Sequence, residues 1–187
     1  MGDRADTHIV ISGTVTTSDA FAALASAAFS ENAKPGWEEG VFEDDGSFYE
    51  HVQASLNEGT SLELYGSDKL GGTMDAIEDV CREHGLTFEV RGERGPSFDS
   101  FVKRWAPGWN EPSIQYGEGD PSIAAKTIVQ LLTKGAAGIE ELHGLARRSL
   151  GVGLPDRIDA SPELRAELER LIQIEFGEAE PSSSPSP

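Results

Sequence analysis

Strand-like and helix-like patterns alternate along most of the chain, and this order restricts the fold more than any other feature. The first strand-like segment is Thr7–Thr16 (THIVISGTVT), where β-branched residues dominate and Ile9, Ile11 and Val15 fall on one side. Ser18 then precedes apolar residues spaced three and four apart, a pattern typical of a capped helix with one apolar stripe. We therefore expect a strand followed by a helix that packs on a sheet.

The same patterns recur further along the chain. Three more strands are predicted, with a fourth candidate at the sheet edge, over residues 61–65, 86–91, 98–105 and 113–116. Ser47 and Glu50 have capping-box spacing ahead of a short helix that runs to about Asn57. Further helices are predicted over residues 73–84, from Asp120-Pro121 onward, and over 139–150 and 161–176.

This order of elements predicts an α/β fold of the α+β sandwich type. We expect a four- or five-stranded mixed sheet with helices packed on it, at least one right-handed crossover and a helical C-terminal part. Residues 1–150 are predicted to form one compact domain, and 151–176 a hinge at Gly151–Pro155 followed by a helix. The Ser/Pro-rich residues 177–187 are predicted to be a disordered tail.

Negative charge is concentrated in one part of the sequence. The chain has 33 acidic and 15 basic residues, a formal net charge of −18, and residues 31–63 hold nine acids with Lys34 as their single base. Such a field repels nucleic acid and anionic membranes and favours a basic protein as partner. A solvated loop or a solubility device is the alternative interpretation of the same acids.

The candidate partner-binding residues come from this acidic segment and from an aromatic cluster. Trp109 belongs to the cluster over residues 98–116, which either packs in the core or forms a homo-oligomeric contact. The full set of candidates is Trp37, Glu38, Glu39, Glu43, Asp44, Asp45, Glu50, Glu58 and Trp109.

No motif in the sequence specifies a reaction, a cofactor or a metal. Gly66–Thr73 has glycine spacing close to that of a phosphate-binding loop, but Gly72 stands where the motif needs lysine and Lys69 lies inside the loop. A flexible turn and a degenerate nucleotide site both remain open for this segment. The four histidines lack metal-ligand spacing, and the adjacent carboxylates cannot be assigned acid or base roles. We therefore expect no catalytic residue and no enzyme activity.

The single cysteine and the hydropathy pattern bear on location. Cys81 has no partner for an intramolecular disulfide, which fits a reducing compartment, and its position on a predicted helix favours a core role. No apolar run approaches the roughly 20 residues that span a bilayer. The amino-terminal residues lack the pattern of a signal peptide. These features predict a cytoplasmic protein without a membrane partner.

The stretch Leu62–Trp109 contains LELYGSDKLGGTMDAIEDVCREHGLTFEV and ends in WAPGW. In this it resembles uncharacterised acidic α/β accessory proteins of bacterial plasmids and phages. The resemblance implies an inhibitor from a mobile genetic element that imitates DNA charge and occupies a DNA-binding or host-defence protein. Our first hypothesis is thus a non-enzymatic acidic binding protein. An assembly protein that oligomerises through the aromatic segment, and a nucleotide-binding enzyme, are the alternatives.

Overall fold

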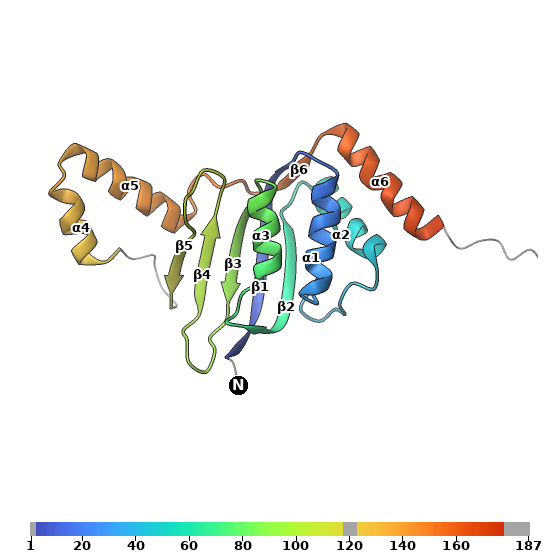
Figure 1. The fold of residues 1–187 in the computed structure, drawn as a ribbon, viewed down its shortest axis with the longest axis horizontal. Helices are drawn as coiled ribbons and strands as arrows, with labels where there is room; N and C mark the ends of the chain where they lie inside the picture. The colour runs from blue at the N-terminus through green and yellow to red at the C-terminus, as the bar shows by residue number, and fades with distance from the viewer. Residues whose placement is uncertain (1–2, 118–122, 178–187) are drawn as a thin grey trace, which may run out of the picture.

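The structure, a computed structural model, describes residues 3–117 and 123–177 of the chain (Figure 1). Its elements alternate between strands and helices in the first half and become mainly helical afterwards. They are, in order, β1 (Arg4–Val15), α1 (Asp19–Ser30), α2 (Asp45–Glu58), β2 (Leu62–Leu70), α3 (Asp75–Glu83), β3 (Thr87–Gly92), β4 (Phe101–Trp105), β5 (Ser113–Tyr116), α4 (Ala125–Leu132), α5 (Ala136–Leu150), β6 (Ile158–Ala160) and α6 (Pro162–Gly177).

The strands form one sheet in the order β2-β1-β3-β4-β5, with antiparallel neighbours throughout. The short strand β6 pairs in parallel with the end of β1, over Gly13–Val15, so the sheet is mixed. Since β2 and β3 flank β1, the connection through α3 crosses over β1. The predicted fold class is confirmed: a mixed sheet carries packed helices, and the C-terminal part is helical.

The core lies between one face of the sheet and helices α1 and α3, which cover that face in Figure 1. Side chains alternate along β1, so that Ile9 and Ile11 are fully buried while His8 and Val10 face the opposite side. Phe88 of β3 and Phe21 of α1 fill the same cluster. Burial of such side chains contributes about 1.5–3 kcal/mol each.

The second helix begins differently from the prediction. Asp44, rather than Ser47, is the N-cap: its carboxylate accepts a hydrogen bond from the Ser47 backbone N–H at 2.7 Å, and the Asp44 N–H donates to Ser47 Oγ at 3.3 Å. Ser47 is therefore the third helical residue. The capping box that was expected between Ser47 and Glu50 is formed instead between Asp44 and Ser47. The helix ends at Gly59, whose left-handed backbone (φ 67°) favours glycine.

The glycine-bracketed segment that begins at Gly66 is largely part of β2, where the sequence suggested a turn. Gly66 pairs with Thr7 and Lys69 with Ala5, so β2 continues to Leu70 beside the long strand β1. The Lys69 ammonium is buried and donates to the carbonyl and the carboxylate of Glu31. The turn predicted over residues 66–72 was wrong for residues 66–70, where pairing with β1 overrides the glycine signal, and the turn is confined to Gly71 and Gly72.

The region after residue 97 also departs from the expected boundaries. The fourth strand begins at Phe101, not at residue 98, and α5 begins at Ala136, three residues early. Strand β6 was not predicted, since three residues are too few to show an alternating pattern. Its Ile158 and Leu168 of α6 join the main core. The predicted helix start at Asp120-Pro121 and the tail beyond residue 177 lie outside the described residues.

Candidate functional site

The loop between α1 and α2 is anchored at both ends and exposes its middle. Lys34 forms a bridge with Tyr65 of β2, the two backbone hydrogen bonds measuring 2.8 and 2.9 Å. At the other end Phe42 is buried, with its ring 5.3 Å from that of Phe48. Between these anchors the chain runs over the surface, and Val41 is 48% exposed. The acidic loop is therefore held in place by its ends.

Three of the predicted carboxylates line one depression of about 390 Å³ beside this loop. Its lining includes the buried Phe42 and also His51, which donates a hydrogen bond from Nε2 to the Glu63 carbonyl at 2.9 Å. The residues that line it are Pro35, Glu39, Gly40, Val41, Phe42, Glu43, Ser47, Glu50 and His51. A depression lined by three acidic residues and by apolar Pro35, Val41 and Phe42 suits the cationic head and the alkyl stem of lysine or arginine.

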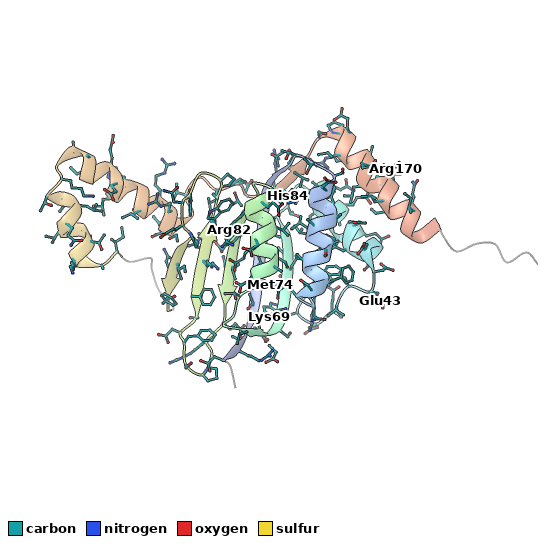
Figure 2. The ribbon with its side chains drawn as sticks, viewed as in Figure 1. Glu43, Lys69, Met74, Arg82, His84 and Arg170 are labelled. Carbon is teal, nitrogen blue, oxygen red and sulfur yellow. The ribbon has the colours of Figure 1, made fainter. Side chains whose placement is uncertain are left out.

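The acidic residues that were predicted to bind a partner have no intramolecular counter-charge among the described residues. Several carboxylates elsewhere form ion pairs, as Glu78 does with Lys103 and Glu89 with Arg104. In the part of the chain that the structure describes, none of the predicted partner-binding acids forms an ion pair, and all are exposed. We name as the acidic surface the side chains of Glu38, Glu39, Glu43, Asp44, Asp45 and Glu50. Figure 2 shows Glu43 at an outer edge of the molecule.

Two predicted residues lie away from the acidic surface. Glu58 is the last residue of α2. It lies about 20 Å along the helix from Asp45, at the other end. Trp109 lies between β4 and β5, where its carbonyl accepts a hydrogen bond from Trp105 Nε1 at 3.0 Å and Arg148 stands 5.9 Å from its ring. Trp109 thus helps to hold α5 against the sheet. Trp37 is 43% exposed and packs 4.8 Å from the ring of Tyr65.

The face of the sheet opposite α1 and α3 carries a cluster of side chains that sequence reasoning missed. Glu63 accepts hydrogen bonds from His8 Nε2 at 3.0 Å and from the Tyr65 hydroxyl at 2.9 Å, and the His8 and Tyr65 rings stack at 4.4 Å. Two depressions of about 460 and 410 Å³ on this face share His8 and Arg91. Alternation marked these residues as facing away from the core, but only strand pairing brings them together.

Two groups on this face have shifted pKa values. Burial lowers the pKa of His8, and the Glu63 carboxylate opposes this only in part, so the ring is neutral near pH 7. Burial on its own raises the pKa of Glu89. The hydrogen bonds and charges of Arg91 and Arg104 outweigh that effect and bring this pKa below its usual value. Glu89 is accordingly an anion that holds two arginines on the sheet.

Other candidate chemistry has a plain structural position. Cys81 is fully buried in the core, and burial raises the pKa of its thiol. Within residues 3–117 and 123–177, no three histidine, cysteine or acidic side chains are grouped in a way that suits a metal ion. None of the described helices has both the length and the apolar character to cross a membrane.

Comparisons of the chain with protein-family models, with curated proteins and with solved structures found no match.

Proposed function

We propose that the protein is a non-enzymatic binding protein that engages a basic protein through the acidic surface. One observation carries this proposal: Glu39, Glu43 and Glu50 line one depression, and none of the three has an ion-pair partner among the described residues. Unpaired anions at a surface attract cations, speed encounter and select partners by charge. A lysine or arginine of the partner supplies the missing counter-charge.

Exposed apolar side chains beside these acids support a protein as the partner. Trp37 and Val41 are 43% and 48% exposed at the rim of the loop. Tryptophan is enriched at the energetic centres of interfaces, because it contributes a large contact area with few rotatable bonds. The arrangement supports capture of a cation at a depression more directly than imitation of duplex DNA, which requires carboxylates in regularly spaced rows.

The partner and its biological setting are part of the proposal. The resemblance of Leu62–Trp109 to accessory proteins of plasmids and phages makes a DNA-binding or host-defence protein the partner that we propose, with the protein acting as its inhibitor in the cytoplasm. A buried, unpaired Cys81 fits a reducing compartment.

A variant in which three carboxylates are replaced by uncharged amides tests the site. The acidic-surface variant replaces Glu39, Glu43 and Glu50 by glutamine, and its matched control replaces the exposed Glu83, Glu111 and Glu169 by glutamine, which gives the same net charge. Binding of a nine-residue arginine peptide is measured by fluorescence anisotropy. Since each lost contact removes up to about 1 kcal/mol, we expect the acidic-surface variant to bind about tenfold or more weakly.

The control variant separates a located site from overall charge. We expect its affinity for the arginine peptide to change less than about twofold, because its carboxylates lie outside the contact and are screened by salt. Equal losses in the two variants would show that only net charge matters. An unchanged affinity in the acidic-surface variant would exclude the depression as the binding site.

A further inference from the structure

Helices α4 and α5 form a hairpin that projects from the end of the sheet beyond β5 (Figure 1). Among the described residues, its side-chain contacts with the sheet lie near the C-terminal end of α5. There Arg104 Nη1 and Gln115 Nε2 donate to the Ser149 carbonyl at 2.7 and 2.6 Å, and Arg148 lies over the ring of Trp109. Helix α4 packs on α5, and in the described ranges it has no comparably extensive contact with another element. The hairpin therefore offers most of its surface to another molecule.

Several large apolar side chains of the hairpin are exposed. Leu131 is the one buried residue of the eight in α4, while Val129 and Leu132 are 61% and 52% exposed and Ile139 of α5 is 46% exposed. Isolated helices shorter than about 12–15 residues are marginal in water and depend on packing of an apolar face. These side chains form a face that fits against a partner.

The hairpin is also the basic part of an acidic molecule. Residues 123–153 contain the four bases Lys126, Lys134, Arg147 and Arg148 and the two acids Glu140 and Glu141, a net charge of +2 in a chain of −18. Lys134 is paired with Glu141 at 2.8 Å. Lys126 is exposed and has no ion-pair partner in the described ranges. The charge and the apolar face thus favour an anionic partner that also exposes apolar groups.

The acidic surface has both properties. Its carboxylates are unpaired, and Trp37 and Val41 are exposed beside them. Figures 1 and 2 place the hairpin and Glu43 at opposite ends of the molecule, with the sheet between them, so the hairpin does not meet the acidic surface of its own chain. A second copy of the chain presents that surface freely.

We propose that the α4–α5 hairpin of one copy docks on the acidic surface of a second copy. We place the two copies antiparallel and side by side, related by a two-fold rotation, so that each hairpin meets the acidic surface of the other copy and the assembly closes as a dimer. In each contact the Lys126 side of the hairpin meets the depression, and Val129 and Leu132 pack against Trp37 and Val41. This inference rests on the proposed function, since it takes the chain itself as one basic partner of the acidic surface.

The mass of the protein in solution tests the dimer. It is measured by light scattering at micromolar concentration and about 150 mM salt, where a Debye length of about 8 Å confines charge effects to groups in contact. We expect the wild type to have twice the mass of the 20.0-kDa chain. The acidic-surface variant and a hairpin variant, Val129→Ser with Leu132→Ser, are each expected to be monomers. The control variant at Glu83, Glu111 and Glu169 stays dimeric.

A single-charge variant guards against local unfolding of α4. Lys126→Glu leaves the apolar face in place and keeps the helix, and we expect it to weaken the dimer about tenfold or more because it sets like charges against each other. If Lys126→Glu dimerises as well as the wild type, the hairpin does not dock on the carboxylates.

Mixing the variants distinguishes reciprocal docking from other assemblies. The hairpin variant keeps its acidic surface and the acidic-surface variant keeps its hairpin, so a mixture of these two monomers restores one of the two contacts and yields a heterodimer. A bundle formed by two hairpins predicts instead that the acidic-surface variant stays dimeric and that the mixture gains nothing. Either of those results overturns the proposal, as does a monomeric wild type.

The outcomes for the two proposals are separable. A monomeric wild type whose arginine-peptide binding depends on Glu39, Glu43 and Glu50 leaves the proposed function standing and removes this inference alone. A wild-type dimer that persists in the acidic-surface variant, together with unchanged peptide binding, removes both.

Discussion

The carboxylates around the sheet and those of the acidic surface belong to the same residue types but have opposite surroundings. Glu78 is 1% exposed and lies 2.5 Å from Lys103 and 3.0 Å from Arg82, whereas Glu39 and Glu43 are exposed without a cationic partner among the described residues. A buried carboxylate must be compensated within the fold, since its desolvation costs several kcal/mol. An exposed one keeps its hydration and remains available to a partner. The residues around an acid therefore decide whether it stabilises the fold or is available to bind another molecule.

The largest effect is expected at Glu78, whose loss leaves Lys103 without a counter-charge inside the protein. We expect Glu78→Gln to lower the free energy of unfolding by about 3 kcal/mol, the usual result of breaking a buried pair. The measurement is the urea midpoint at pH 7. Asp79→Asn is the control, because it removes an ion pair with Arg82 in which the Asp79 side chain is 76% exposed. We expect it to lower the free energy of unfolding by less than about 1 kcal/mol. Equal losses would remove the distinction between buried and exposed carboxylates.

Glu89 is predicted to have an intermediate effect that depends on pH. Glu89→Gln is expected to cost about 1–2 kcal/mol at pH 7, since Glu89 binds Arg91 and Arg104 at 2.7 and 2.5 Å. Its pKa is lower in the folded protein than the usual 4.5, so its contribution is complete above that pH and is lost as the pH falls through the folded value. Urea unfolding at pH 7 and at lower pH should therefore show the wild type and the variant converging in acid. A constant difference contradicts the pairing.

Asp44 belongs to the acidic surface but also caps α2, and it is expected to combine both behaviours. Asp44→Ala removes the acceptor of the Ser47 N–H and should lower the free energy of unfolding by about 1 kcal/mol. Asp44→Ser keeps a capping oxygen and should recover most of this loss. Thermal unfolding of both variants checks the point, and an alanine variant as stable as the wild type would remove the capping role.

The smallest change in stability is predicted where we expect the largest change in binding. The acidic-surface variant at Glu39, Glu43 and Glu50 should unfold within about 0.5 kcal/mol of the wild type, because exposed, unpaired side chains contribute little to folding. The same preparation is predicted to lose binding of the arginine peptide. A destabilisation above about 1 kcal/mol would show that these carboxylates have structural partners after all, and would weaken the comparison.

Much of the fold was predictable because its signals are local. The β-branched run Thr7–Thr16 identified the central strand, and the three-and-four spacing from Ser18 identified the helix that covers it. Where local signals failed, a distant partner decided. Gly66 and Lys69 are strand residues because β1 extends beside them, and β6 exists because three residues of β1 remain free to pair with it.

The candidate site divides in the same way. The distribution of charge along the chain located the acids of residues 31–63, and the cost of burying a charge explains why most of them are exposed. Glu31 and Glu63 are the exceptions, since they are half-buried and paired with Lys69 and His8. Sequence could not separate Glu58 and Trp109 from the other candidates, because distance along a helix and across a sheet appears only in three dimensions. It also missed the group of His8, Glu63 and Tyr65, whose members lie on two strands.

The amino-acid sequence by itself determined the class of fold, the concentration of charge and the absence of any motif that specifies a reaction, since propensity, periodicity and net charge are properties of neighbouring residues. The tertiary structure was needed to show which acids are paired, which three line one depression and that the basic hairpin lies at the opposite end from the acidic surface. The reason is that pairing energies depend on distance and burial, and the fold sets both.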